Sequence, residues 1–168
     1  MKLIIVFKSW LLLGFCFVSV LTVKGQVNHD AIRLQVFQKA MIGKTFTFGK
    51  WTKNGQTETR LQYLGTFIGG QKTYKVMNSA WFWGLTRRAT SRILIYDNQN
   101  RYIGNYYLTL ATDLPDKLAD GKLIFTNKGK PECDKALITK VDMNAGIPKS
   151  FFLKCKGNEG DIYSFSTE

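Results

Sequence analysis

The sequence predicts a mainly β protein of the α+β type. We expect an N-terminal helix over residues 28–42 and then an antiparallel β-meander of about eight strands over residues 44–166, barrel-like or strongly curved. Apolar residues recur at helical spacing before residue 43, and β-rich runs alternate with turn residues after it. Short loops make consecutive strands antiparallel neighbours, and a meander of this length tends to curl or close.

The first 25 residues have the pattern of a secretory signal peptide. A cationic start precedes an apolar run from Trp10 to Val23, and Gly25 provides a small residue before a cut at Gln26. A retained membrane anchor is the alternative. A spanning helix needs about 20 apolar residues, whereas Lys8 and Lys24 bracket fifteen. We therefore expect residues 26–168 to form one secreted or periplasmic domain, with no membrane span after cleavage.

The helix predicted over residues 28–42 has recognisable ends. Asn28 can cap it, Asp30 complements the helix dipole in the first turn, and Gly43 can stop it. Its predicted apolar face consists of Ile32, Val36, Phe37, Ala40 and Met41.

The strands are predicted from alternating side chains and from the turns between them. Asn54-Gly55 is a tight-turn signal, and the run from Asp97 to Asn100 separates the clearest hairpin. Asp113–Ala119 is interpreted as a brief helical turn with Pro115 at its first position. The predicted strands are Lys44–Thr52, Thr57–Phe67, Lys72–Phe82, Thr90–Tyr96, Arg101–Leu110, Lys122–Thr126, Lys135–Met143, Ser150–Cys155 and Asp161–Ser166.

Two cysteines remain after the predicted cleavage, Cys133 and Cys155. An even number of cysteines in an oxidising compartment predicts one disulfide. Two cysteines cannot complete a tetrahedral zinc site, and the single histidine, His29, lies far away in the sequence, so we expect no metal. Cys16 lies inside the leader, where bulky Phe15 disfavours lipidation.

The chain is strongly basic, with 24 Lys and Arg against 12 Asp and Glu. Such a balance favours an anionic envelope component or a partner protein. The alternative is that scattered lysines only keep an exported protein soluble. We do not expect nucleic acid to be the partner.

Catalytic motifs are lacking in the sequence: it has no nucleophile elbow, no zinc-protease His pair and no phosphate-binding glycine loop. His29 is interpreted as a solvated residue beside a helix cap. The acids over residues 113–134 are conceivable as a glycosidase pair or a calcium site, although capping and turn formation explain them more simply. They are Asp113, Asp116, Asp120, Glu132 and Asp134.

Trp81-Phe82-Trp83 is the most unusual local feature, and it is followed by Arg87, Arg88 and Arg92. In a strand, the two tryptophans point one way and Phe82 the other. An exposed pair could stack on sugars or bases while the arginines contact phosphate or sulfate. An internal pair would be core, which is the usual place for large aromatic residues.

These observations lead to one functional hypothesis and two alternatives. We expect an exported, non-enzymatic binding module without a cofactor, with Trp81, Trp83, Arg87, Arg88 and Arg92 as candidate binding residues. The first alternative is an inhibitor or immunity-type protein that binds a partner enzyme. The second is an unrecognised hydrolase that uses the acids in residues 113–134.

Overall fold

The computed structural model describes residues 29–167. The predicted signal peptide, residues 1–25, and the predicted cap Asn28 lie outside the described residues. One helix, α1 (His29–Lys39), is followed by strands and by a short 3-10 turn, η1 (Ala111–Asp113). The strands are β1 (Thr45–Gly49), β2 (Glu58–Gly69), β3 (Lys72–Trp83), β4 (Arg88–Asp97), β5 (Tyr102–Leu108), β6 (Lys117–Ala119), β7 (Lys122–Thr126), β8 (Ile138–Asp142), β9 (Ser150–Lys156) and β10 (Glu159–Ser166).

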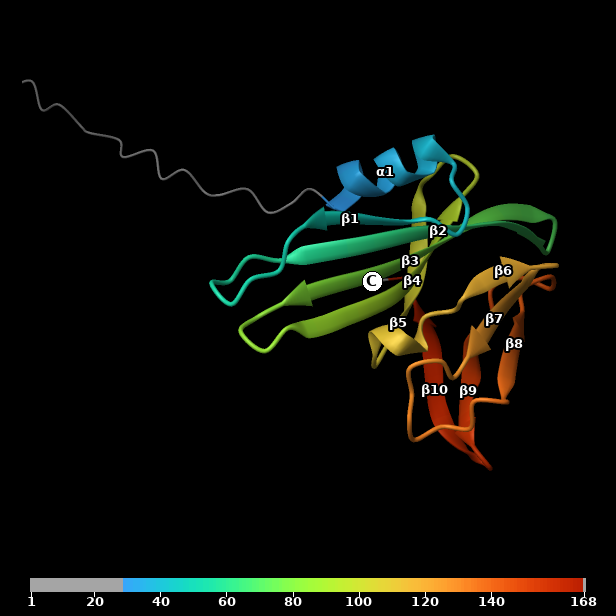
Figure 1. The fold of residues 1–168 in the computed structure, drawn as a ribbon. Helices are drawn as coiled ribbons and strands as arrows, with labels where there is room; N and C mark the ends of the chain where they lie inside the picture. Colours follow the sequence, from blue (N-terminus) through green and yellow to red (C-terminus); the bar gives the residue numbers. More distant parts are fainter. Residues whose placement is uncertain (1–28, 168) are drawn as a thin grey trace, which may run out of the picture.

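The strands form two antiparallel sheets (Figure 1). A seven-stranded sheet has the order β1-β2-β3-β4-β5-β10-β9, and a three-stranded sheet has the order β6-β7-β8. The prediction of a mainly β fold with one N-terminal helix is confirmed. The predicted meander holds only from β1 to β5, because β10 returns to pair with β5 and β6–β8 leave the main sheet. β1 and β9 are the two outer strands of the large sheet and do not pair with each other, so the predicted barrel-like closure is not confirmed.

Two apolar cores lie on opposite faces of the large sheet. On β3, Val76 enters the core shared with the small sheet, whereas the next residue, Met77, enters the core beneath α1. This alternation follows from the pleat, which sends successive side chains to opposite faces. The helix contributes the buried residues Ile32, Val36 and Phe37, as its spacing predicts.

The helix ends earlier than the sequence predicts. Ala40 adopts a φ of 48° and its N–H bonds to the carbonyl of Phe37, so the helical pattern stops at Lys39 rather than before Gly43. Ala40 and Met41, predicted on the apolar face, therefore lie beyond the helix and are exposed. No helix among residues 29–167 is long and apolar enough to cross a membrane.

The helical turn predicted over residues 113–119 is wrong. Residues Lys117–Ala119 instead form β6, which pairs with β7 through a tight turn at Asp120-Gly121. Both turn residues have positive φ, 52° and 68°, as a two-residue hairpin turn of the Asp-Gly type requires. Hairpin pairing with β7 thus prevails over the helix-start signal of Pro115.

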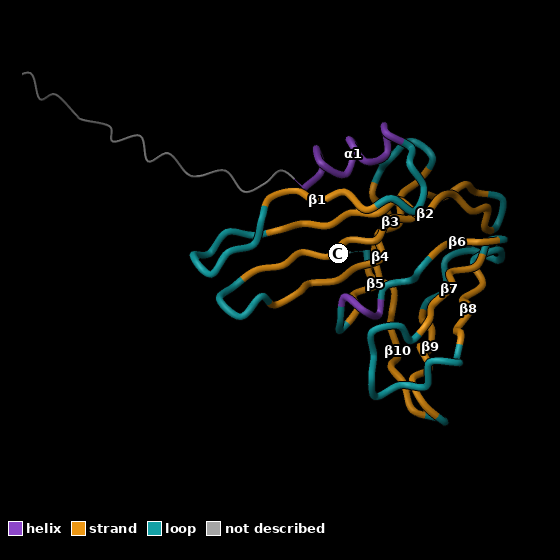
Figure 2. The backbone as a smooth tube through the Cα atoms, viewed as in Figure 1, coloured by secondary structure: helices purple, strands orange, loops and turns teal. Residues whose placement is uncertain are grey.

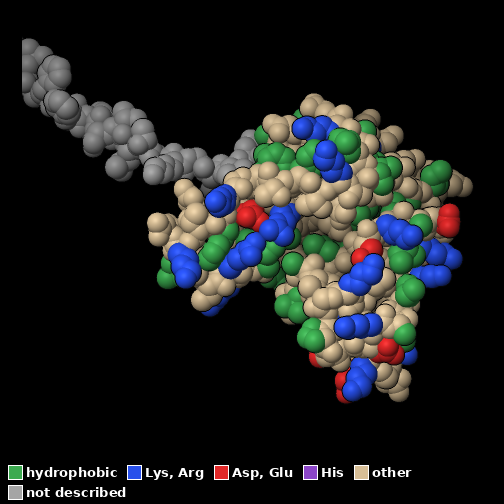
Figure 3. Space-filling view, in the orientation of Figure 1, with side chains coloured by type: hydrophobic (Ala, Val, Ile, Leu, Met, Phe, Trp, Pro, Cys, Tyr) green, Lys and Arg blue, Asp and Glu red, His purple; other side chains and the backbone are tan. Residues whose placement is uncertain are grey.

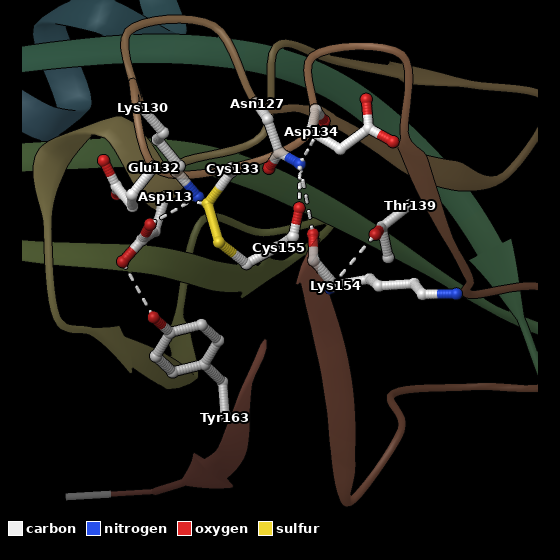
Figure 4. Close-up of a disulfide and its surroundings, with 10 residues drawn as sticks. All are labelled: Asp113, Asn127, Lys130, Glu132, Cys133, Asp134, Thr139, Lys154, Cys155 and Tyr163. Atoms are coloured by element: carbon white, nitrogen blue, oxygen red, sulfur yellow. Dashed lines mark hydrogen bonds and ion pairs between the residues drawn. A yellow bond between two sulfur atoms is a disulfide. The ribbon is translucent and has the colours of Figure 1, made fainter. Parts of the chain in front are cut away.

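The predicted disulfide between Cys133 and Cys155 is present (Figure 4). It joins the loop after β7 to β9. Beside it, the Asn127 side chain donates to the carbonyls of Asp134, Lys154 and Cys155, and the Asp134 N–H donates to the Cys155 carbonyl at 2.9 Å. The loop is therefore held to β9 by one covalent bond and by several hydrogen bonds.

Candidate functional site: a tryptophan and arginine surface

Trp81 and Trp83 lie side by side near the end of β3, on the sheet face that carries α1. Their ring centroids are 5.7 Å apart with an interplanar angle of 25°, so the rings stack. His29, at the start of α1, meets Trp81 edge-on at 6.2 Å, and Trp83 Nε1 donates to Thr90 Oγ1 at 3.1 Å. Both tryptophans are half-buried. His29 and Thr90 therefore hold the pair in place, and both tryptophans remain partly exposed to solvent.

Two arginines flank the tryptophan pair on the same face. Arg88 lies opposite Trp83 in the β3–β4 register, and its guanidinium carbon is 5.7 Å from the ring centroid. Arg92 lies opposite Tyr107 on β5, with its guanidinium carbon 5.5 Å from that ring. We call this group the tryptophan surface, which consists of His29, Trp81, Trp83, Arg88, Arg92 and Tyr107.

His29 is half-buried against Trp81 rather than freely solvated. Burial lowers the pKa of His29, and the nearby charge of Arg33 lowers it further. The imidazole is therefore neutral at pH 7, and the positive charge of the tryptophan surface comes from Arg88 and Arg92.

Arg87, the remaining candidate binding residue, lies elsewhere. It stands in the β3–β4 turn with a φ of 54°, and its guanidinium lies over Phe82 at 5.0 Å and over Trp51 at 5.8 Å. The Glu58 carboxylate is 3.7 Å from Arg87 and accepts a bond from Arg60 at 2.7 Å. Phe82 points to the face opposite the two tryptophans, so the structure separates Arg87 from Arg88 and Arg92.

Glu58 is a buried carboxylate among these cations. Desolvation raises its pKa, but hydrogen bonds from Arg60 and from the Trp51 N–H, together with the charges of Arg60 and Arg87, outweigh that effect and lower the pKa. The carboxylate is therefore ionised at neutral pH and balances part of the charge of the two arginines.

A groove of about 330 Å³ lies on the Phe82 face, between the large sheet and the segment that leads into β6. Figure 3 shows the surface hollowed between these two parts of the molecule. Arg60 and Lys128 lie along it, and Asn78 forms part of its wall. The Asn78 amide donates to Gln62 and to the Pro115 carbonyl, so it ties the two sides of the groove together.

The acids considered for catalysis do not form one site. Asp113 is buried and accepts bonds from Lys130 Nζ at 2.6 Å and from the Tyr163 hydroxyl at 2.7 Å (Figure 4). The other four acids are exposed: Asp116, Asp120, Glu132 and Asp134. Among residues 29–167, no cluster of three or more His, Cys, Asp or Glu side chains could hold a metal ion.

The positive charge of residues 31–168 is concentrated in one half, which the total count does not reveal. Residues 31–96 contain eleven Lys and Arg and a single acid, Glu58, whereas residues 97–168 contain ten of each sign. The basic half forms most of α1 and strands β1–β4, which also carry most of the tryptophan surface. A separate count for each half of the sequence would have found this asymmetry, which is typical of proteins that bind an anionic partner.

Fold and surface together define a two-sheet β protein with one helix and with a cationic, aromatic surface on its basic half. Comparison with protein-family models, with curated proteins and with solved structures finds no match.

Proposed function

We propose that this protein is an exported, non-enzymatic binding module that captures an anionic ligand on the tryptophan surface. The observation that carries the proposal is the stacked, half-buried pair Trp81 and Trp83 beside Arg88 and Arg92. The rings offer a flat apolar area. The guanidinium groups offer forked donors that match phosphate, sulfate or carboxylate.

Two features support an exported site of action. The leader pattern predicts cleavage before Gln26. The disulfide between Cys133 and Cys155 is of the kind that persists in oxidising compartments.

The test is capture of the mature chain, with its N-terminus checked by intact mass, on immobilised heparin and on immobilised polyphosphate. We expect binding that weakens with salt, because released counterions drive association with a polyanion. Trp81→Ala or Trp83→Ala should weaken binding to heparin, whose sugar rings offer faces for stacking, by about 1–3 kcal/mol, the range for lost stacking of aromatic side chains on nucleic acid bases. Polyphosphate has no ring, so its binding should depend mainly on the arginines. Arg88→Gln and Arg92→Gln should reduce the salt dependence.

Two variants in the charge-balanced half serve as controls. Lys140→Gln removes one exposed cation and Phe152→Ala removes one exposed aromatic ring, and both should bind as the parent does. Circular dichroism checks that every variant is folded. The proposal fails if the tryptophan variants and the controls bind both polymers equally well.

A further inference from the structure

The end of the sheet beside the tryptophan surface is formed by two loops that are joined to each other. The β1–β2 loop spans residues 50–57 and the β3–β4 loop spans residues 84–87. Trp51 Nε1 in the first loop donates to the Gly84 carbonyl in the second at 2.8 Å, and the Arg87 guanidinium lies over the Trp51 ring. Figures 1 and 2 both show the two loops side by side, projecting beyond the strands. We call residues 50–57 and 84–88 the double-loop tip.

The double-loop tip is cationic and contains no acidic residue in its sequence. Its four basic side chains, Lys50, Lys53, Arg87 and Arg88, are exposed. Glu58, just beyond the tip, balances part of the charge of Arg87. The remaining positive charge therefore faces outward at the end of the molecule.

An apolar side chain stands among these cations. Leu85 is 74% exposed in the β3–β4 turn, next to Gly84, whose φ of 69° suits a tight turn. The half-buried rings of Trp51 and Trp83 lie beside this turn, because Trp51 donates to the Gly84 carbonyl and Trp83 directly precedes Gly84. A projecting leucine is by itself ordinary on a protein surface. Its combination with basic side chains and interfacial tryptophans is the composition of surfaces that dock on lipid bilayers.

We infer that the double-loop tip docks on the surface of an anionic bilayer. Lys50, Lys53 and Arg88 contact the lipid headgroups, and Leu85 enters the interface between headgroups and acyl chains. The inference rests on the proposed preference for an anionic ligand, and it names the partner as a membrane surface. The membrane-docking site is distinct from the tryptophan surface, because Leu85, Lys50 and Lys53 lie outside that surface.

The experiment is co-sedimentation of the mature chain with vesicles of phosphatidylcholine, with and without phosphatidylglycerol. We expect binding only to the anionic vesicles. The Lys50→Gln/Lys53→Gln variant should bind about fivefold more weakly for each cation removed. Leu85→Ser should bind about five- to tenfold more weakly because its apolar side chain no longer enters the interface. In Leu85→Trp, the additional fluorescence should be quenched by vesicles that contain a bromine-labelled lipid.

The matched control for Leu85→Ser is Ile162→Ser, which removes an equally exposed apolar residue, 72% exposed, from the distant β9–β10 hairpin. It should bind vesicles as the parent does. Lys135→Gln/Lys156→Gln is the control for charge, and it should also bind as the parent does.

The outcomes separate this inference from the proposed function. If Leu85→Ser and the lysine variant bind anionic vesicles as the parent does, or if neutral vesicles bind equally well, the membrane inference is overturned. Capture on heparin that is lost in Trp81→Ala would then leave the proposed function intact, with a soluble polyanion as the ligand. If the parent binds neither anionic vesicles nor the two polymers, both proposals fail.

Discussion

At the scale of single residues, Asp113 is a buried acid held by several hydrogen bonds. Its residue is 4% exposed, and its carboxylate accepts bonds from Lys130, from the Tyr163 hydroxyl and from the Leu110 N–H. These contacts come from β10, from the loop after β7 and from the residue that precedes η1. Asp113 therefore ties three distant parts of the chain together, which gives it a structural role.

Replacing Asp113 should destabilise the fold strongly. Asp113→Asn leaves the buried Lys130 ammonium without its partner, and breaking a buried ion pair in this way costs about 3–5 kcal/mol. Urea denaturation measures the loss. Asp116→Asn, at an exposed carboxylate three residues away, is the control and should change the free energy of unfolding by less than about 0.5 kcal/mol. Equal stability of the two variants would contradict the structural role of Asp113.

The tryptophan surface shows how far sequence reasoning reaches for a site. Strand alternation alone predicts that Trp81 and Trp83 share a face, and their rings do stack. The same reasoning could not assign Arg87 to a face of the sheet, because Arg87 lies in a tight turn, where side chains no longer alternate as they do in a strand. It also did not join Tyr107 and His29 to the tryptophan pair, because their approach depends on strand register and on how α1 packs.

At the scale of elements, local patterns predicted most strands but not all of their partners. β7 has the predicted bounds, Lys122–Thr126, because alternating side chains and clear turns define it. β6 was missed, because Pro115 suggested a helix start and three residues are too few to show alternation. The pairing of β10 with β5 joins segments more than fifty residues apart, and no local signal encodes such a contact.

Among the features at this scale, the disulfide is the one whose removal should change stability by a predictable amount. Cys133 and Cys155 are separated by 22 residues, and the loop-entropy model gives about 3 kcal/mol for a loop of that length. Cys133→Ser/Cys155→Ser should lower the free energy of unfolding by about 2–4 kcal/mol while the protein still folds, since the Asn127 hydrogen bonds remain. Chemical denaturation with and without a reducing agent measures this. A parent protein whose stability is unchanged by reduction would contradict the prediction.

At the scale of the whole molecule, buried tyrosines in both cores make the stability of the fold depend on pH. Burial raises the pKa of Tyr96, in the core beneath α1, to about 12, and raises that of Tyr163, in the core between the sheets, to about 12. An exposed tyrosine in the unfolded chain has a pKa of about 10. The native state therefore favours the neutral phenols.

Stability should accordingly fall at alkaline pH. A raised pKa stabilises the fold fully below about pH 10, and this contribution is lost as the pH rises towards about 12. Denaturation midpoints across that range, followed together with tyrosinate absorbance, measure the effect. Tyr96→Phe should show a smaller alkaline loss than the parent does. An identical pH dependence of parent and variant would show that Tyr96 has no part in it.

The loop that the disulfide fastens to β9 has a consequence for solubility. β9 is the terminal strand of the large sheet, and terminal strands present unpaired backbone groups on which a second chain can form β-structure. Asn127 and Asp134 occupy the carbonyls of Lys154 and Cys155, so part of this strand is not available for such pairing. In a reducing environment these hydrogen bonds alone would hold the loop on β9, without the covalent link. Self-association of reduced protein should therefore begin at the β9 end of the sheet.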